Sequence, residues 1–187
     1  TPHFKKAVQE AGVYSVMCAY NRLNDLPCCG SHFVDSLLRV SWGFKGYIVS
    51  DCWAIDDFFE KGHHEVVPTE EQAAAMAIKA GTDLNCGETY KVLTEAVKQG
   101  LVSEAEIDVS VKRIILARMK LGMFDDPTQV KWAQIPYNVV DSKEHQQLAR
   151  ETAKKSMVLL KNDHNTLPFS KSLKNVAVIG PNADNID

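Results

Sequence analysis

Asp51 stands directly after an apolar run, residues 47–50, that is typical of a β-strand. In enzymes built on parallel sheets, the side chains that do chemistry lie at such junctions between a strand and the following loop. A carboxylate there could act as a nucleophile, as a general base or as a metal ligand. It could also cap the turn after the strand, because aspartate is favoured at such positions.

Two other apolar segments, residues 13–20 and 82–86, have the same character. The three segments begin 34 and 35 residues apart, and mostly apolar runs of this kind are expected of parallel strands buried on both faces. The carboxyl ends of parallel strands meet at one edge of a sheet, where sites collect. We therefore expect Tyr20 and Cys86 to lie close to Asp51.

Helices are expected between and after these strands, and their starts carry readable signals. The signals are Ser31, a capping box of Thr69 and Gln72, and a capping box of Ser103 and Glu106. Further helices are predicted over residues 90–99 and 142–160. The alternation of strands and helices implies a parallel sheet. Tetratricopeptide repeats share a period of about 34 residues, but they are all-helical and contain no strand such as residues 47–50.

The chain is predicted to hold parts of two α/β domains. Residues 1–123 carry the three strands and all of these helices except the one over residues 142–160, and they are assigned to the first domain. Residues 124–170 are interpreted as a linker and a bridging helix. Residues 171–187 begin the second domain, with a new strand over residues 176–179.

The composition argues against several classes of partner. The 187 residues carry 21 Lys and Arg against 24 Asp and Glu. Without a basic patch, we expect no nucleic acid partner. No apolar run approaches the roughly 18 residues that a membrane span requires. No targeting signal is readable at the start of the sequence.

Five cysteines are present: Cys18, Cys28, Cys29, Cys52 and Cys86. They are too few for the disulfide framework of a small secreted domain, and none forms a C-x-x-C pair. Free cysteine is among the most buried residue types. From the residues alone, we expect small buried hydrophobic side chains.

The loop after Asp51 contains His63, His64 and Glu65, which together suggest a metal site. The spacing does not match H-E-x-x-H, and adjacent side chains rarely converge on one ion. We predict no metal and no cofactor, and we interpret this stretch as a surface loop. Asp83, in the middle of the third apolar segment, is predicted to be a hydrogen-bonded structural residue.

Several motifs, in order along the chain, resemble those of family 3 glycoside hydrolases. They are Ala-Tyr-Asn-Arg-Leu-Asn at 19–24, Trp-Gly-Phe-Lys-Gly at 42–46, Val-Ser-Asp at 49–51, Ala-Gly-Thr-Asp-Leu at 80–84, Lys-Leu-Gly-Met-Phe at 120–124, Met-Val-Leu-Leu-Lys-Asn at 157–162, Leu-Pro at 167–168 and Val-Ile-Gly-Pro-Asn at 178–182. The resemblance covers essentially the whole chain. Ordered motifs at family-like spacing are far more specific than any one of them.

The resemblance implies a mixed α/β fold in two parts. Residues 1–123 would form the C-terminal part of a (β/α)8 TIM-type barrel. Residues 124–170 would form the linker and bridging helix, and residues 171–187 the first strand of an α/β sandwich domain. The missing flanking segments of a parent enzyme are then the chain's expected partners.

The resemblance also implies a function, that of a retaining exo-acting β-glycosidase. Asp51 would be the nucleophile that forms a covalent glycosyl-enzyme, and Tyr20 would lie beside it. The second carboxyl group of this chemistry would come from beyond residue 187, so the fragment alone is expected to be inactive. Expected substrates are oligosaccharides or aryl β-glycosides with terminal β-D-xylosyl or β-D-glucosyl residues. The family further implies a secreted or periplasmic enzyme.

The sequence departs from the family directly after the nucleophile. Many members have tryptophan there, whereas this chain has Cys52 and then Trp53. Together with Cys86, this form resembles the branch that includes β-xylosidases, in which two such cysteines can pair beside the site. That resemblance implies that Cys52 and Cys86 are close and narrow the sugar pocket. Trp53 is interpreted either as a stacking platform for a sugar or as a core residue.

Two other functions stay open at this point. The chain could be an inactive, truncated carbohydrate-binding paralogue. It could also belong to a different barrel enzyme, such as a lyase that uses a metal at Asp51. The loop at residues 63–65 is interpreted as a surface loop, with contact to a sugar as the alternative.

Overall fold

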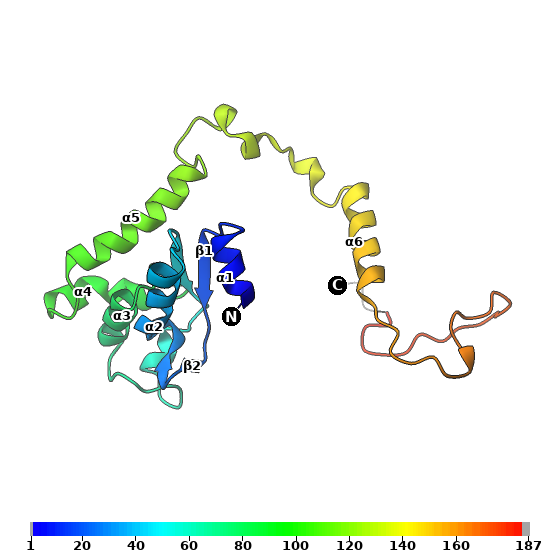
Figure 1. The fold of residues 1–187 in the computed structure, drawn as a ribbon, viewed down its shortest axis with the longest axis horizontal. Coiled ribbons are helices and arrows are strands. Elements are labelled where there is room, and N and C mark those ends of the chain that lie inside the picture. The colour runs from blue at the N-terminus through cyan, green and yellow to red at the C-terminus, as the bar shows by residue number, and fades with distance from the viewer. Residues whose placement is uncertain (1, 185–187) are drawn as a thin grey trace. The chain divides into compact units, whose positions relative to one another are not determined.

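The computed structural model describes residues 2–184 (Figure 1). Contacts between Cα atoms divide the chain into two units after Gln134, and each unit is described by itself below. Among the described helices, none combines the length and the apolar character needed to cross a bilayer.

The first unit contains four strands and five helices among its described residues. They are α1 (Pro2–Gln9), β1 (Ser15–Cys18), β2 (Arg22–Leu23), β3 (Leu26–Pro27), α2 (His32–Asp35, continued by a π-helix at Ser36–Ser41), β4 (Tyr47–Ser50), α3 (Glu70–Lys79), α4 (Leu93–Lys98) and α5 (Glu104–Lys120). Short 3-10 helices lie at Cys28–Gly30, Asp56–Phe58 and Thr89–Val92.

The parallel sheet forms between the first two predicted strands. The register pairs Ser15 with Tyr47, Val16 with Ile48, Met17 with Val49, and Cys18 with Ser50. Strands β1 and β4 therefore end at the same edge, as the sequence predicts. A parallel pair needs a crossover connection, and α2 with its π-helical continuation supplies it.

The third strand, predicted over residues 82–86, is reduced to a single parallel bridge between Val49 and Leu84. The backbone amide of Ser50 donates to the Leu84 carbonyl at 2.8 Å. The amide of Cys86 donates to the Ser50 hydroxyl at 2.9 Å instead of to a backbone carbonyl. The backbone hydrogen-bond ladder between β4 and this segment stops there, because the Ser50 side chain accepts the hydrogen bond that a backbone carbonyl would accept in a longer strand.

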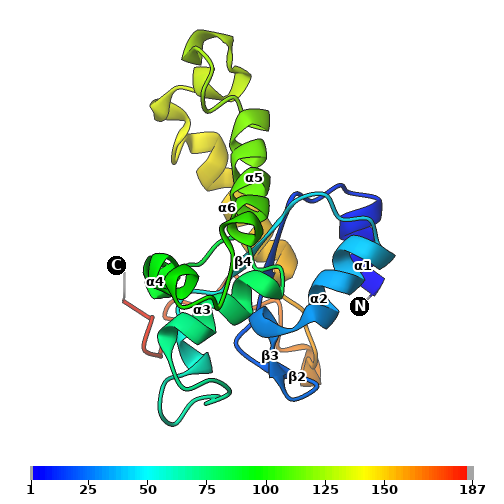
Figure 2. The ribbon, with the colours of Figure 1, turned by 90° about the vertical axis from the view of Figure 1, so that its left-hand side faces the viewer.

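The structure contains a β-hairpin between β1 and α2 that the sequence patterns do not predict. Strands β2 and β3 are joined by Asn24 and Asp25, whose φ angles are 52° and 67°. Two residues with positive φ are what a tight type I′ hairpin turn requires, and asparagine and aspartate tolerate it well. The hairpin is seen at the lower end of the first unit in Figure 2 and carries Arg22.

The predicted helix starts are confirmed to different degrees. At α5, the Ser103 hydroxyl accepts from Glu106 N at 3.3 Å and the Glu106 carboxylate accepts from Ser103 N at 2.8 Å, a complete capping box. At α3, the Thr69 hydroxyl accepts from Gln72 N at 3.3 Å. Ser31 occupies the position before α2, but its side chain makes no capping hydrogen bond there.

The core of the first unit lies between the sheet and α3. Its largest fully buried side chains include Ile48 from β4 and Ile55 and Phe58 from the segment just after Asp51. Ala73 and Ala77 of α3 are completely buried against them, as their helical spacing predicts. The loop that follows the candidate site is thus anchored in the core.

The other face of the sheet is open in the described residues. Met17 is 59% exposed and Leu84 is 37% exposed. The sequence predicts strands buried on both faces, and among the described residues only the face toward α3 is covered. Within the described part of the first unit, the side chains that alternate away from the core lack a covering element.

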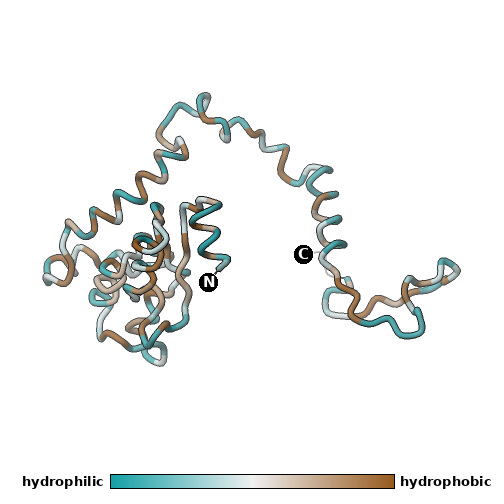
Figure 3. The backbone as a smooth tube through the Cα atoms, in the orientation of Figure 1, coloured by the Kyte–Doolittle hydropathy of each residue, from teal (hydrophilic) through white to brown (hydrophobic). Residues whose placement is uncertain are grey.

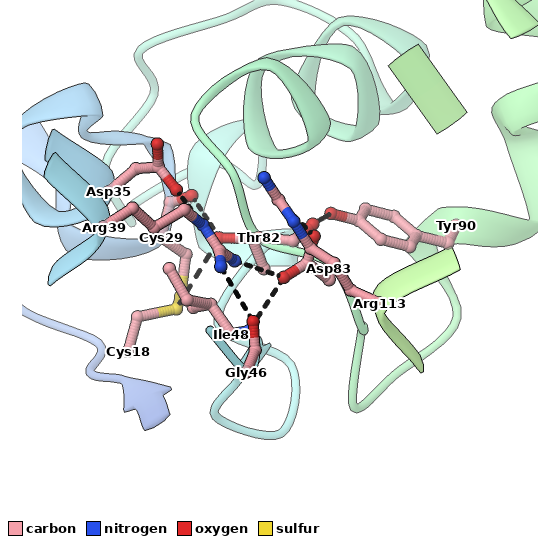
Figure 4. A network of polar contacts seen from close by, with 10 residues as sticks. All are labelled: Cys18, Cys29, Asp35, Arg39, Gly46, Ile48, Thr82, Asp83, Tyr90 and Arg113. Atoms are coloured by element: carbon pink, nitrogen blue, oxygen red, sulfur yellow. Dashed lines mark hydrogen bonds and ion pairs between the residues drawn. A yellow bond between two sulfur atoms is a disulfide. The ribbon is translucent and has the colours of Figure 1, made fainter. Parts of the chain in front are cut away.

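Asp83 is the centre of a buried ion network (Figure 4). Its side chain is fully buried and accepts from Arg39 at 2.7 Å, from Arg113 at 2.8 Å and from the backbone amide of Ile48 at 2.9 Å. Arg39 also pairs with Asp35 at 2.6 Å. The network joins α2, its π-helical continuation, β4 and α5, which confirms the structural role predicted for Asp83.

Two glycines permit this close packing. A Cβ on Gly46 would overlap the carbonyl oxygen of Tyr14, and the Gly46 carbonyl accepts from Arg39 at 2.7 Å. Gly81 has a φ of +91°, and a Cβ there would overlap the carboxylate of Asp35. Any side chain at these positions would separate the elements that carry the ion network.

The second unit contains one long helix, α6 (Lys143–Ser156), among its described residues. The sequence predicts a helix to residue 160 with Leu148 facing inward, but the helix ends at Ser156 and Leu148 is 65% exposed. Residues 176–179, predicted as a strand, form none, and Ile179 is 91% exposed. A strand needs a hydrogen-bonded neighbour, which the described residues of this unit do not provide. Figure 3 shows the apolar residues along the extended stretch after α6.

Candidate active site

Asp51 lies at the carboxyl end of β4 and is half-buried. Its backbone amide donates to the carbonyl of Cys18 at 3.1 Å, so the pairing with β1 continues one residue past the strand. One carboxylate oxygen accepts from the amide of Cys52 at 2.8 Å. The carboxylate is therefore held in place by the turn, which realises part of the capping role considered above.

Tyr20 lies beside Asp51, as predicted. Its hydroxyl donates to the carbonyl of Cys52 at 2.7 Å. Partial burial, the contact with the Asp51 carboxylate and the negative charges of Asp51 and Asp57 together raise the pKa of Tyr20. The ring is 46% exposed, so Tyr20 is not a core aromatic residue in this chain.

Cys52 and Cys86 form a disulfide at the same edge, with their Cα atoms 4.3 Å apart. The predicted proximity of these two cysteines is confirmed. Ser50 supports the arrangement, because its hydroxyl lies 3.1 Å from the side-chain oxygen of Asn85 and accepts from the amide of Cys86. The disulfide thus covalently joins the ends of the second and third parallel segments.

Trp53 presents an aromatic side chain beside the candidate nucleophile. It has a φ of 67°, its amide donates to the Cys86 carbonyl at 2.7 Å, and it is 54% exposed. Within the described residues, this exposure favours the stacking interpretation of Trp53 over a core position. The hydroxyl of Thr89 donates to Asp56 and fastens the same turn to the following segment.

A second disulfide, between Cys18 and Cys29, is absent from the sequence prediction. Four of the five cysteines are paired, and Cys28 is free. The expectation of small, unpaired cysteines is wrong because the hairpin of β2 and β3 returns the chain to the end of β1. The turn residues Asn24 and Asp25 are the sequence signal that could have revealed this pairing.

His64 reaches across from the loop after Asp51 to the segment that carries Tyr20. Its Nε2 atom lies 2.7 Å from the carbonyl oxygen of Tyr20. The Nε atom of Arg22 donates to His64 Nδ1 at 3.2 Å, and the guanidinium also donates to the His64 carbonyl. Sequence reasoning weighed His64 for a metal and did not identify Arg22.

The neighbouring histidine has a separate environment. His63 pairs with Asp57 and lies 3.7 Å from Glu60. Across residues 2–184, no group of three or more His, Cys, Asp and Glu side chains is arranged to hold a metal ion. Glu88, the nearest glutamate in sequence after the third segment, pairs with Lys91 on the surface.

The arrangement gives Asp51 the surroundings of a reactive carboxylate. It is fixed by backbone hydrogen bonds, faces an exposed edge, and has Tyr20, Trp53 and the disulfide as neighbours. Such a group can attack an electrophilic carbon or accept a proton. An attack that expels an alcohol also needs a proton donor for the leaving oxygen.

Comparisons with known protein families give two matches along the chain. A family described as "Glycosyl hydrolase family 3 N terminal domain" matches residues 1–117. A second, described as "Glycosyl hydrolase family 3 C-terminal domain", matches residues 157–187. The first match contains every residue of the candidate site.

Two relatives illustrate the similarity. A xylan 1,4-beta-xylosidase from Xylanibacter ruminicola is 44% identical over 187 residues, which are 98% of this chain and 22% of the relative. A β-xylosidase/α-L-arabinofuranosidase 2 from Medicago sativa subsp. varia is 43% identical over 187 residues, 98% of this chain and 24% of the relative. The chain thus spans less than a quarter of the length of these relatives.

Solved structures show the same similarity. A GH3 exo-β-xylosidase in complex with a xylobiose aziridine probe matches with a TM-score of 0.83 and 37% identity, over 93% of this chain and 23% of that one. A β-glucosidase from Erythrobacter marinus matches with a TM-score of 0.77 and 33% identity, over 89% and 22%. These likenesses confirm the predicted fold class, although residues 176–179 form no strand here.

Proposed function

Because this chain belongs to glycosyl hydrolase family 3, we propose that it supplies the nucleophile of a retaining, exo-acting β-glycosidase, and that Asp51 is that nucleophile. The Asp51 carboxylate attacks the anomeric carbon, the glycosidic bond breaks, and a covalent glycosyl-enzyme forms. The leaving oxygen takes its proton from a second carboxylic acid, which later activates water to release the sugar.

The observation that carries this proposal is the position of Asp51 at the shared end of β1 and β4. One backbone hydrogen bond, from the amide of Cys52, fixes the carboxylate, and Tyr20 stands against it. Covalent catalysis by a carboxylate requires a nucleophile that is held in position for attack, and these contacts provide that position.

The second carboxylic acid lies outside this chain in our proposal. It must stand about 5–5.5 Å from Asp51 to serve a retaining mechanism. Glu88 is paired with Lys91, and no other glutamate is bonded to a residue of the candidate site in the described residues. Residues 1–187 alone are therefore expected to show no hydrolysis.

Tyr20 assists in its protonated form. Its pKa is raised by partial burial and by Asp51, so the hydroxyl keeps its proton at neutral pH and remains a hydrogen-bond donor. In that state it can donate to the Asp51 carboxylate or to the ring oxygen of the sugar. Trp53, exposed beside it, offers a flat apolar surface on which a sugar can stack.

We propose a terminal β-D-xylosyl residue as the preferred substrate, with β-D-glucosyl as the alternative. The named functions of the two relatives above support xylose, and a β-glucosidase among the similar structures keeps glucose open. The disulfide between Cys52 and Cys86 adds fixed bulk beside Asp51. Xylose lacks the hydroxymethyl group of glucose and needs less room.

We further propose a secreted or periplasmic location. Two disulfides among five cysteines are the supporting observation. Disulfides persist in oxidising compartments and are rare in the cytosol of most organisms.

Hydrolysis by the full-length protein that carries this segment tests the function. Aryl β-xyloside should be cleaved, with a smaller rate on aryl β-glucoside, and Asp51→Ala should abolish both. Sugar binding without cleavage would indicate a non-catalytic carbohydrate-binding protein. Loss of cleavage on chelation of metals would indicate the metal-dependent lyase, and either result would overturn the proposal.

A further inference from the structure

We propose that His64 and Arg22 are positioning residues that hold Tyr20 against Asp51, a role that rests on the glycosidase function proposed above. Arg22 lies in the hairpin segment and His64 in the loop after Asp51, 42 residues further along the chain, and their contact connects the two segments. The juxtaposition of His64 Nε2 and the Tyr20 carbonyl oxygen, 2.7 Å apart, is the central contact.

The hydrogen-bonding partners of His64 select one state of its ring. The Tyr20 carbonyl can only accept, so Nε2 must carry a hydrogen and donate to it. The Arg22 guanidinium can only donate, so Nδ1 must be unprotonated and accept from it. The ring is therefore neutral, with its hydrogen on Nε2, and neither nitrogen is left for a metal ion.

The loop that carries His64 is rooted in the core. The amide of His64 donates to the Asp57 carbonyl at 2.8 Å, and the amide of Val66 donates to the Phe58 carbonyl at 2.8 Å. Phe58 is completely buried. Through these bonds, a rigid part of the molecule fixes the position of the imidazole that holds the Tyr20 backbone.

The other side of the contact is held by the hairpin. Arg22 begins β2 and pairs with Pro27 of β3. The disulfide between Cys18 and Cys29 closes the segment at its base. Arg22 donates both to the ring and to the carbonyl of His64, so the orientation of the imidazole is fixed at two points.

Tyr20 needs such support because it follows the end of β1 and is 46% exposed. Its hydroxyl is held by one hydrogen bond to the Cys52 carbonyl. Without the bond from His64, the backbone of Tyr20 is free to move and the ring can leave Asp51. A displacement of about 1 Å in a catalytic group can lower a rate by about 100-fold.

The test compares His64→Leu with His63→Leu in the full-length enzyme. The two histidines are adjacent, but the ring of His63 pairs with Asp57 and Glu60 and makes no hydrogen bond to Tyr20 in the described residues. We expect His64→Leu to lower kcat by about 10- to 100-fold with little change in KM. His63→Leu should leave both values near those of the wild type. Equal effects of the two changes would overturn the proposal.

Rescue and coupling distinguish positioning from general destabilisation. His64→Gln keeps an N–H donor near the place of Nε2 and should restore most of the activity. In a double-mutant cycle, His64→Leu should have little further effect in a Tyr20→Phe background, because both changes act through one hydroxyl. Independent, additive effects would show that His64 does not act through Tyr20.

A measurement without turnover separates this inference from the proposed function. The ionisation of Tyr20 can be followed by NMR of the ring carbon that bears the hydroxyl, assigned with Tyr20→Phe. We expect His64→Leu to lower the Tyr20 pKa toward its ordinary value, since the ring would move into solvent. An unchanged Tyr20 pKa in an active enzyme would overturn the positioning role alone. A lowered pKa in a protein without glycosidase activity would overturn the function and retain the positioning of Tyr20.

Discussion

The backbone amide of Asp51 donates to the carbonyl of Cys18 at 3.1 Å, which ties the candidate nucleophile to the last residue of the neighbouring strand. Cys18 is itself joined to Cys29 by a disulfide. The segment between those two cysteines carries Tyr20. The position of the carboxylate and that of the hydroxyl beside it are therefore set by the same strand end.

Removal of the Asp51 carboxylate should abolish glycoside hydrolysis. We expect Asp51→Ala to lower kcat on an aryl β-xyloside by about 10⁴-fold or more, because no covalent intermediate can form. Added azide should restore part of the rate by attacking the anomeric carbon in the space left by the carboxylate. The product should be an α-glycosyl azide, identified by NMR.

The matched control is Asp108→Ala, which removes a carboxylate from the exposed side of α5. It should leave kcat and KM unchanged. If Asp51→Ala kept more than a few per cent of the activity without azide, Asp51 would not be the nucleophile.

Part of the candidate site follows from local sequence patterns. Apolar runs that end at Tyr20 and Asp51 predict two parallel strands, and parallel strands must share an edge. The structure confirms both strands and the proximity of the two side chains. The capping box of Ser103 and Glu106 is equally local and is also confirmed.

The remainder depends on contacts between segments that are distant in sequence. Nothing near His64 indicates that its ring meets the Tyr20 carbonyl, 44 residues away. The pairing of Cys18 with Cys29 requires the hairpin to be recognised first. The strand predicted over residues 176–179 fails for the related reason that a strand is stable only beside a partner.

The activity should fall at high pH when Tyr20 loses its proton. Its pKa is raised above the ordinary value of 10.0 by partial burial and by Asp51, so the hydroxyl is protonated at neutral pH. As pH rises through that raised pKa, a phenolate forms that repels the Asp51 carboxylate and can no longer donate to it. kcat/KM should therefore decline on the alkaline limb of its pH profile. Circular dichroism should be measured over the same pH range to exclude unfolding.

Tyr20→Phe provides the comparison for this limb. The variant should be slower at neutral pH and should lack the alkaline decline attributed to the hydroxyl. A decline of the same size and midpoint in the variant would assign the limb to another group.

Loss of Asp83 should destabilise the protein strongly. Its fully buried carboxylate faces both Arg39 and Arg113. Removing one partner of a buried ion pair leaves the other charge uncompensated, at a cost of about 3–5 kcal/mol. We expect Asp83→Ala to lower the urea midpoint of the full-length protein accordingly. Glu95→Ala, which breaks an exposed pair with Lys98, should shift the midpoint little, and equal shifts would contradict the structural role of Asp83.

The disulfide between Cys52 and Cys86 should determine which sugar is preferred. It lies against the turn that carries Asp51, so its removal should enlarge the site beside the nucleophile. We expect the double variant Cys52→Ala with Cys86→Ala to raise the ratio of kcat/KM on aryl β-glucoside to that on aryl β-xyloside. The increase should be about 10-fold or more, the scale on which a pocket discriminates one small group.

The second disulfide supplies a control of the same chemical kind. Cys18→Ala with Cys29→Ala also removes one cross-link, and either loss should lower stability by about 2–4 kcal/mol. The bond between Cys18 and Cys29 closes the base of the hairpin segment, whereas the turn of Trp53 is fastened to the Cys86 carbonyl. Removal of the Cys18–Cys29 bond should therefore leave the ratio of glucoside to xyloside activity unchanged. A ratio that rises equally in both double variants would assign the effect to loosened structure, and a ratio that stays constant in both would place the selection of the sugar elsewhere in the enzyme.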